Sequence, residues 1–581
     1  MRTHRILAIG LALLAITALA GAQTWTALTN PPSVPIGTSL LLTDGTVMAQ
    51  AMSTNGFGTG NWWRLTPSSS GSYVNGTWSA LASMPSGYSP LYYASAVLPD
   101  GRVVVEGGEY NVTSDVETTL GAIYNPVTNA WTSITPPSGW THIGDGQSAV
   151  LPNGTFMLGN CGLAGSICSP YELQQALLNA TSLTWTITGT GKADNNSAEG
   201  WTLLPNGDVL TVDVWNGTES EVYNPTTGKW TLAGSTVSTL VNTACDEIGP
   251  AVLRPEGSVF AIGATNETAI YTTSTGTWAA GPSFPTGYGV NDGPAAILPD
   301  GNVLVGVSPI SPCYSTGSKY YEFNGTSLTS VSGPPRAGSD ASYVGRMLVL
   351  PTGQIMFTDG STSVEIYTAA GTYQAAWQPT VSSVASTLIV GSTNNAISGT
   401  QFNGLSQGAM YGDDAQMATN YPLVRITNTS SGQVVYCKTH NHSTMGVATG
   451  SATVSTEFDI PSTIGTGAST LVVVANGIPS NPVNVTVSAG ALSCTPTLMC
   501  AVSGQPPGQV VNGSVSLQCN QAAILSASAM ICGNTCVTDT VSPPEPVTSV
   551  GAGDATPGNS GSCALSWSWG GNNYQQTIDV N

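Results

Sequence analysis

Basic residues are scarce in this chain. Lys and Arg number 12 against 32 Asp and Glu, which gives a net charge of −20. Nucleic acids and anionic membranes both require basic surface, so neither is an expected partner. Histidine is also rare, and after Ala22 the chain has only His142, His440 and His442. Few positions can therefore supply imidazole to a metal site.

Long apolar runs are missing as well. No segment after Ala22 approaches the ~20 apolar residues that a helix needs to cross a bilayer. The segment 1–22 holds Arg2 and Arg5, an apolar stretch from Ile6 to Leu19, and then Ala20-Gly21-Ala22. This pattern favours a secretory signal peptide over 1–22, with a membrane anchor as the alternative. We expect a secreted protein, extracellular or periplasmic, without a membrane span after cleavage.

The residues that are abundant favour β structure. The chain holds 68 Gly and 37 Pro, and only 8% of its residues are charged while 41% are hydrophobic. Glycine and proline mark tight turns, and a chain this apolar is not expected to be disordered. The composition therefore predicts an all-β protein with many short strands.

One phrase recurs seven times: apolar residues, a turn such as Leu-Pro-Asp-Gly, and a second apolar strand. The turn glycines follow one another at similar intervals, at Gly45, Gly101, Gly154, Gly207, Gly257, Gly301 and Gly353. Asp-Gly and Asn-Gly supply the positive φ of a hairpin turn. A β period of about 50 residues is typical of kelch repeats. We therefore predict a seven-bladed kelch-type β-propeller over 23–378.

Aromatic residues mark the outer strands of the predicted blades. Tyr124, Tyr223, Tyr271 and Tyr367 lie in the third strands, and Trp78, Trp131, Trp185, Trp230 and Trp278 lie in the fourth. We expect these rings to pack in the core rather than to stack on a ligand. An extra fourth-strand phrase at Trp25 precedes the first hairpin, and it can pair with the last blade and close the ring.

The period stops after Trp377. Residues 379–488 read as alternating strands of an immunoglobulin-like β-sandwich, and 489–581 as a Cys-rich β tail. In a secreted chain, cysteines are expected to form disulfides. The expected disulfide cysteines are Cys161 with Cys168 and, in the tail, Cys494, Cys500, Cys519, Cys532, Cys536 and Cys563. The total of 11 is odd, so at least one thiol is not paired within the chain.

Two segments resemble the galactose oxidase and glyoxal oxidase family: YYASAVLPDGRVVVEGG from Tyr92 and VVYCKTHNHSTMGVATG from Val434. The resemblance implies a propeller with a C-terminal sandwich. It also implies a copper ion held by two tyrosines and two histidines, with one tyrosine cross-linked to a cysteine. The matching residues are Tyr92, Tyr343 and either His442 or His440.

This sequence departs from the family at two ligand positions. Val344 stands where the second histidine is expected, and no cysteine occurs before Cys161 although the cross-linking partner belongs near Ile36. Valine cannot bind a metal, and copper(II) favours nitrogen-rich sites. We therefore expect no copper-radical cofactor. His440 and His442 could still bind a metal as a His-x-His pair, or form ordinary hydrogen bonds.

Carboxylates recur at one place in the predicted inner strands. Each lies at a similar short distance before its turn glycine, and the set is Asp145, Glu199, Asp246, Glu247 and Asp292. Because inner strands line a propeller's channel, these residues are expected to meet at one mouth, together with Tyr92, Tyr343 and His142. They could cap strands around a water-filled channel, bind calcium, or act as an acid/base pair on a glycan.

The prediction for function is a non-catalytic extracellular binding or structural module. Its ligand would be a glycan, a protein or a surface bound at the propeller mouth. The alternative is an enzyme, either a divergent copper oxidase or a carbohydrate-active enzyme that uses the channel carboxylates.

Overall fold

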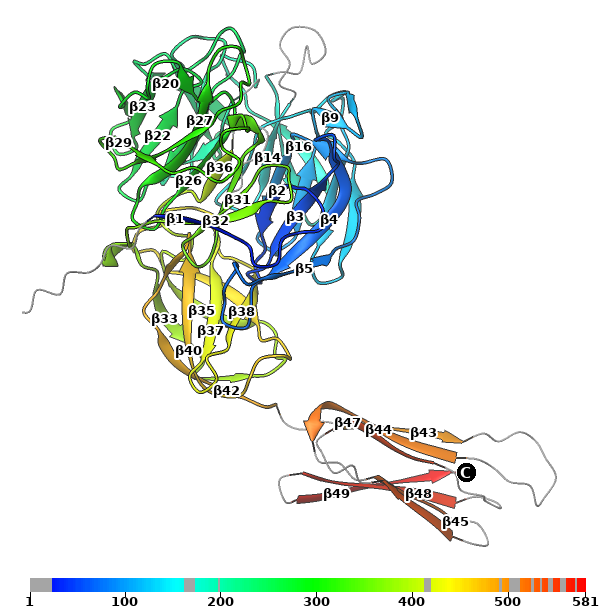
Figure 1. The fold of residues 1–581 in the computed structure, drawn as a ribbon. Coiled ribbons are helices and arrows are strands. Elements are labelled where there is room, and N and C mark those ends of the chain that lie inside the picture. Colours follow the sequence, from blue (N-terminus) through cyan, green and yellow to red (C-terminus); the bar gives the residue numbers. More distant parts are fainter. Residues whose placement is uncertain are drawn as a thin grey trace, which may run out of the picture. The chain divides into compact units, whose positions relative to one another are not determined.

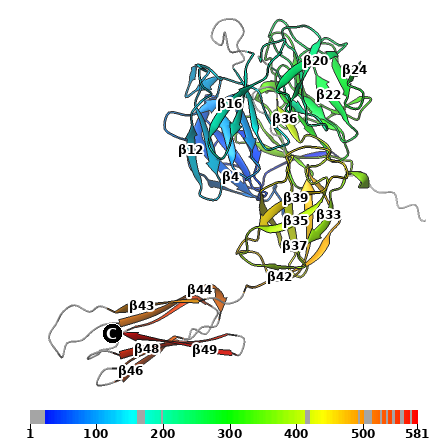
Figure 2. The same cartoon turned by 180° about the vertical axis from the view of Figure 1, so that it is seen from behind.

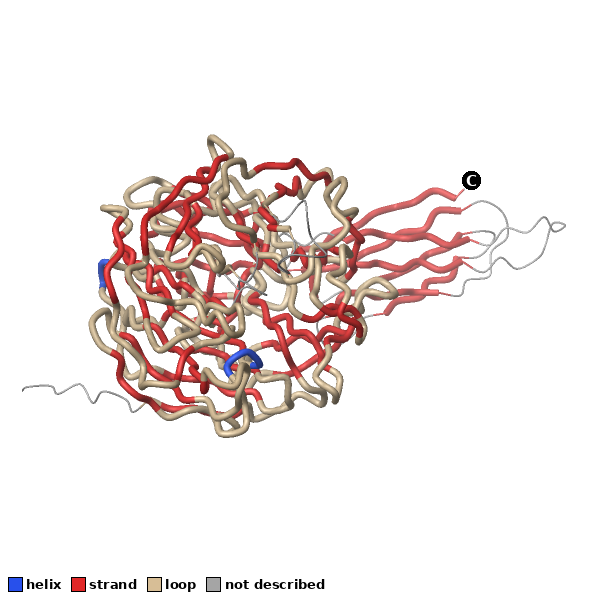
Figure 3. Tube along the Cα trace, turned by 90° about the horizontal axis from the view of Figure 1, so that it is seen from above, coloured by secondary structure: helices blue, strands red, loops and turns tan. Residues whose placement is uncertain are grey.

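The protein is nearly all β, as the composition predicts. The computed structural model describes residues 23–160, 173–196, 199–411, 420–490, 494–500, 513–523, 527–532, 536–541, 547–553, 561–569 and 572–580. Within these residues the helical elements are two 3-10 turns, η1 (Ser342–Val344) and η2 (Ala375–Trp377), as Figure 3 shows. None of the described helices is long and apolar enough to cross a membrane. The predicted signal peptide, Cys161 and Cys168 lie outside the described residues.

Seven antiparallel sheets of the described residues share one plan, in which four strands follow one another across the sheet (Figure 1). The first strands are β2 (Ile36–Leu41), β7 (Ala94–Val97), β13 (Ser148–Val150), β17 (Thr202–Leu203), β21 (Ala251–Leu253), β26 (Pro294–Ile297) and β30 (Arg346–Val349). The second strands are β3 (Val47–Met52), β8 (Val103–Glu106), β14 (Phe156–Gly159), β18 (Val209–Val212), β22 (Ser258–Ile262), β27 (Val303–Pro309) and β31 (Ile355–Thr358).

The outer half of each sheet follows the same order. The third strands are β4 (Gly58–Thr66), β11 (Gly121–Asn125), β15 (Gln175–Asn179), β19 (Glu219–Asn224), β23 (Thr268–Thr272), β28 (Lys319–Phe323) and β32 (Val364–Thr368). The fourth strands are β5 (Thr77–Ala80), β12 (Ala130–Ile134), β16 (Thr184–Thr188), β20 (Lys229–Ser235), β24 (Thr277–Ala280), β29 (Leu328–Val331) and, from the start of the chain, β1 (Thr24–Ala27).

The predicted hairpin turns are confirmed. All seven turn glycines have positive φ, between 74° and 87°, and each joins the first strand of a sheet to the second. We call the ends of the sheets that carry these turns the hairpin face. The opposite ends carry the connections that precede first strands and follow second strands, and we call them the loop face.

The seven sheets are joined to one another through their first strands. Each first strand contacts the next one in the series β2, β7, β13, β17, β21, β26 and β30, and β30 contacts β2 in turn. The N-terminal strand β1 completes the last of these sheets because it pairs with β32, with Trp25 opposite Tyr367. The predicted pairing of the Trp25 phrase with the last repeat is therefore confirmed.

The recurrent aromatic residues are packing residues. Tyr124, Tyr223 and Tyr367 are fully buried, and the rings of Tyr124 and Trp131 lie 5.1 Å apart across neighbouring strands. The fourth-strand tryptophans also bond to the preceding sheet, as when Trp131 Nε1 donates to the Ala82 carbonyl at 3.0 Å. Where such a bond forms, the tryptophan fixes its sheet to the preceding one.

The C-terminal part of the same compact unit forms a further antiparallel sheet. Its strands run in the order β33 (Thr380–Val384), β35 (Asn395–Thr400), β39 (Val454–Asp459), β38 (Val434–His440), β37 (Leu423–Asn428) and β40 (Gly467–Ala475). This region contacts the hairpin face: Thr444 Oγ1 donates to the Pro152 carbonyl at 3.0 Å, and the Tyr421 hydroxyl donates to the Leu41 carbonyl.

One strand of this region leaves it and enters the ring of first strands. β36 (Ala409–Tyr411) pairs antiparallel with β26, with Ala296 opposite Ala409, and it also contacts β21 and β30. Figure 2 shows β36 among the seven sheets. The open, water-filled channel that we considered from the sequence is therefore partly filled by the chain itself.

The rest of the described chain belongs to a second compact unit. In it, β34 (Thr387–Ile389) runs parallel to residues 486–488 of β42 (Val483–Ser488). The tail strands are β43 (Cys494–Cys500), β44 (Gly513–Ala523), β45 (Ala527–Cys532), β46 (Cys536–Val541), β47 (Val547–Gly553), β48 (Gly561–Trp569) and β49 (Asn572–Val580). Their register places Cys494 opposite Cys519 and Cys532 opposite Cys536.

Candidate functional site

Four tyrosines form a row on the loop face. Tyr92 precedes β7, Tyr110 begins β9 (Tyr110–Asn111), Tyr314 follows β27 and Tyr343 lies in η1. The ring centroid of Tyr92 is 6.2 Å from that of Tyr110 and 6.5 Å from that of Tyr343, and Tyr343 is 5.4 Å from Tyr314. All three pairs meet edge to face, which is a favourable arrangement for aromatic rings. We call these residues the tyrosine row.

Acidic side chains gather around the tyrosine row. Glu247 precedes β21 and accepts a hydrogen bond of 2.6 Å from the Tyr314 hydroxyl. It interacts electrostatically with Asp292, Asp145 and Glu109, which come from three other loops of the same face. Glu117 in turn interacts with Asp145 and Glu109. We call these five carboxyl groups and the tyrosine row together the acidic mouth.

Three of the mouth carboxyl groups have raised pKa values. Burial, followed by repulsion from Asp145, Asp115 and Asp292, raises the pKa of Glu109 to about 8. Burial and then Asp145 raise the pKa of Glu117 to about 9. Burial and then Asp292 raise the pKa of Glu247 well above its ordinary value. These shifts have one physical cause, which is that several anions share a poorly solvated space.

Two further features hold the loops of the mouth in place. The buried Arg346 lies over the Tyr92 ring at 5.7 Å, and its Nη1 donates to the Tyr343 carbonyl at 2.7 Å. A disulfide joins Cys245 to Cys313, so it ties the loop that carries Glu247 to the loop that carries Tyr314. This disulfide was not among the predicted ones. Cys437 is a buried free thiol, which agrees with the odd cysteine total.

The structure places the predicted carboxylates in different regions. Asp145, Glu247 and Asp292 meet in the acidic mouth. Asp246 is exposed beside Glu247, with φ at 59°, and His142 is hydrogen bonded to Thr141 at 3.0 Å.

Glu199 does not lie in the mouth. It is fully buried next to the fourth sheet (β17 to β20), where its Oε1 accepts a hydrogen bond of 2.9 Å from Lys192 Nζ, which also reaches Glu221 Oε2 at 2.9 Å. Glu199 precedes its turn glycine at a distance similar to that of the other carboxylates, but its loop follows a different path. The reason is that its side chain forms an ion pair with Lys192, which lies upstream. The idea that Asp145, Glu199, Glu247 and Asp292 hold one calcium ion is therefore wrong for Glu199.

The residues matched to the copper site are not brought together. Tyr92 and Tyr343 are neighbours in the tyrosine row. The charge of Asp100 acts on His442, so His442 lies near the hairpin turn that follows β7. Tyr92 precedes β7. Tyr92 and Tyr343 therefore lie toward one end of β7 and His442 toward the other. These three side chains are not placed to share a copper ion.

The two histidines each have their own partners. His440 ends β38, and its Nε2 is 3.0 Å from Asp459 Oδ1. Asn441 has φ at 54°, so the strand alternation on which the His-x-His idea depends stops there. His442 bonds to Thr456 Oγ1 at 2.8 Å and stacks on Tyr421. Burial, and then His440, lowers the pKa of His442 to about 3.

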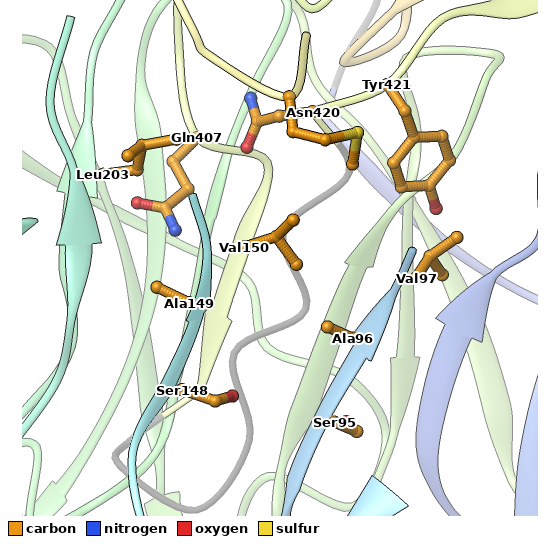
Figure 4. A pocket seen from close by; sticks show the side chains of 11 residues that line it. Ser95, Ala96, Val97, Ser148, Ala149, Val150, Leu203, Gln407, Asn420 and Tyr421 are labelled. Carbon is orange, nitrogen blue, oxygen red and sulfur yellow. The ribbon is translucent and has the colours of Figure 1, made fainter. Parts of the chain in front are cut away.

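A small cavity lies between first strands β7 and β13 (Figure 4). Ser95 and Ser148 line it from these strands, and Gln407, Asn420 and Tyr421 line it from the C-terminal region. Its polar groups are hydroxyls and amides, without a charged side chain. The cavity is therefore a less reactive environment than the acidic mouth.

The sequence analysis does not predict Glu109, Glu117 and Tyr314 as mouth residues, nor the Cys245–Cys313 pair. All except Cys245 follow the second strand of a sheet, whereas the predicted carboxylates all precede first strands. In an antiparallel sheet these two kinds of segment lie at the same end. Aligning both would have placed Glu109 beside Asp145, and Cys313 beside Cys245.

No protein-family model matches the chain, and no curated protein matches it. Among solved structures, an oligogalacturonate lyase in complex with manganese aligns over 48% of this chain and 96% of its own, at 10% identity and a TM-score of 0.26. The tricorn protease aligns over 92% of this chain and 51% of its own, at 9% identity and a TM-score of 0.26. A tetra-tandem repeat of a large adhesion protein aligns at 12% identity and a TM-score of 0.17, over 96% of this chain and 99% of its own.

Proposed function

We propose that the chain is a secreted, seven-bladed kelch-type β-propeller with an immunoglobulin-like domain on its hairpin face, and that it is a non-catalytic binding module. The observation that carries this proposal is the acidic mouth: four tyrosines and five carboxyl groups from separate loops meet on the face opposite that domain. Its ligand is a protein segment that presents ammonium groups.

The chemistry of the mouth favours an ammonium ligand. Carboxylates that raise one another's pKa are relieved when a cation enters between them, and tyrosine rings attract an ammonium group through their faces. Lysine side chains provide both a charge for the acids and an apolar stem for the rings.

The rim of the mouth favours a protein as the source of that ammonium group. Val112, Val116 and Tyr314 are among the most exposed large apolar side chains, at 53%, 46% and 42%, and all three lie on loop-face segments next to mouth residues. Apolar groups around a charged centre are typical of a protein interface.

The test is binding of a labelled peptide of alternating Lys and Val, measured by fluorescence anisotropy. We expect saturable binding that weakens with salt and strengthens as pH rises and the mouth ionises. Glu247→Gln should weaken binding about tenfold, the effect of one lost charge-assisted hydrogen bond. Asp208→Asn is the matched control, because it removes the same charge from the hairpin face and should leave binding unchanged.

Three outcomes contradict the proposal. Equal weakening by both variants would show that only net charge attracts the peptide. No binding, or binding that does not depend on Glu247, would remove the mouth from the interaction. Preference for a neutral chitin oligomer over the peptide would assign the mouth to a glycan instead.

A further inference from the structure

A second group of acids lies next to the fourth sheet, apart from the mouth. Asp194 and Glu199 lie in the connection that precedes β17, and Asp213 directly follows β18. One carboxylate oxygen from each lies within 4.8 Å of the others. All three residues are buried, with 4%, 0% and 0% of their surface exposed. In the part of the chain that the structure describes, these are the three side chains among Asp, Glu, His and Cys that lie close enough together to share one ion.

The protein satisfies two of these three carboxylates. Glu199 accepts from Lys192 Nζ at 2.9 Å and from Thr211 Oγ1 at 3.1 Å. Asp194 Oδ2 accepts from the Trp215 backbone N–H at 2.8 Å. Asp213 differs, because neither of its oxygens has a hydrogen-bond partner at normal geometry, although the Asn216 amide lies nearby. A fully buried acid without a well-formed partner is costly, and a ligand between the three residues would reduce that cost.

The charges around Asp213 favour a cation as that ligand. Four carboxylates (Asp194, Glu199, Asp213 and Glu221) surround one ammonium group, and Lys192 is committed to Glu199 and Glu221. Asp194 and Asp213 have no ion-pair partner among the described residues. A divalent cation between Asp194, Glu199 and Asp213 would leave the cluster close to neutral.

We propose that Asp194, Glu199 and Asp213 bind one divalent cation of the calcium class. The donors are all hard oxygens, which calcium prefers, while zinc and copper favour nitrogen and sulfur. Calcium also accepts six to eight ligands in irregular geometry, so backbone carbonyls and water complete the shell. The ion joins the connection before β17 to the loop after β18, and so fixes two loop-face segments of the fourth sheet.

The experiment uses the full chain, freed of metal by a chelator and dialysed. Equilibrium dialysis counts the calcium bound, and thermal unfolding measures its effect on Tm. We expect one tightly held calcium per chain and a rise in Tm of about 2–5 °C at a hundredfold excess over Kd. Terbium should bind competitively and luminesce on excitation of tryptophan, because the Trp230 ring lies 5.0 Å from Lys192 Nζ.

Variants locate the site. Asp213→Asn should abolish the calcium-dependent rise in Tm and the terbium signal. Glu106→Gln is the matched control, because Glu106 is equally buried and also lacks a hydrogen-bond partner but lies on β8 of another sheet; it should keep both responses. Glu247→Gln in the acidic mouth should keep them too, so failure of the peptide-binding proposal leaves this test intact.

Three results would overturn the proposal. Bound calcium below one per chain, with Tm unchanged, would mean that the cluster is a plain ion-pair network. A calcium response kept by Asp213→Asn, or lost in Glu247→Gln, would place the ion elsewhere. If Asp213→Asn does not fold, the calcium count and the terbium signal of the unmodified chain, compared with those of Glu247→Gln, decide the question.

Discussion

The acidic mouth and the cluster next to the fourth sheet are built from the same kinds of segment, yet they manage their charge differently. In the cluster, Lys192 is buried between Glu199 and Glu221 and forms two ion pairs of 2.9 Å. In the mouth, Glu109, Glu117 and Glu247 have raised pKa values caused by burial and by other acids. Burial also raises pKa values in the cluster, that of Glu199 to about 8 and that of Asp213 to about 7, but there the ammonium group of Lys192 opposes the rise. The loop face thus separates acids that share a buried counterion from acids that mainly repel one another.

The largest loss of stability is expected when Lys192, the buried counterion of the cluster, is replaced. Lys192→Met should cost about 3–5 kcal/mol of unfolding free energy, since it leaves Glu199 and Glu221 buried without a cation. Urea unfolding at neutral pH measures this loss. Lys319→Met is the control, because the exposed Lys319 only covers the Tyr288 ring. A loss as small as in the control would show that the cluster carboxyls are already protonated, as in the mouth, and the contrast between the two regions would fail.

The disulfide tests whether the mouth depends on its loops being tied. Replacing Cys245 and Cys313 together by Ser should cost about 2–4 kcal/mol, because the bond links positions that are 68 residues apart. The variant should also bind the Lys-Val peptide more weakly, since Tyr314 and Glu247 lose their shared support. Unchanged stability together with unchanged peptide binding would mean that the tyrosine row alone fixes these loops.

A smaller effect should follow from pH. Between its ordinary value of 4.5 and about 9, Glu117 keeps a proton in the folded chain that the unfolded chain has released. Stability is therefore fully present at low pH and is lost as pH rises through this range. Glu117→Gln should be similar to the parent in stability near pH 4 and increasingly more stable than the parent as pH rises to 8. A stability difference that does not change with pH would show that Glu117 ionises normally and that the mouth is well solvated.

Much of the fold was accessible from the sequence because it depends on local chemistry. The seven turn glycines predict their hairpins, because glycine readily adopts the positive φ that such turns require, and five of the seven follow Asp or Asn. The Trp25 phrase indicates its partner because it repeats the fourth-strand pattern. The insertion of β36 was not predictable in this way: it lies beyond the repeats, and its pairing with β26 depends on a long-range fit that no local pattern carries.

The site was predictable only in part. Asp145, Glu247 and Asp292 were found because similar offsets in equivalent strands place side chains at similar heights. Glu199 has nearly the same offset but lies elsewhere, because the buried Lys192, a short way upstream, competes for it. Electrostatic partners outside the repeated phrase decide where an acid in a loop settles, and a single sequence does not reveal them.

The insertion of β36 has a consequence for the time course of folding. The first unit can be finished only after residue 411 has left the ribosome, because β36 fills space between β26, β21 and β30. The β1 strand must likewise wait for β32, which belongs to the last of the seven repeats. Contacts of such large sequence separation make folding slow. During synthesis β1 therefore stays unpaired until β32 has been made, and the edge of β26 stays unpaired until β36 has been made. These strands are where a chaperone or a neighbouring copy would bind first.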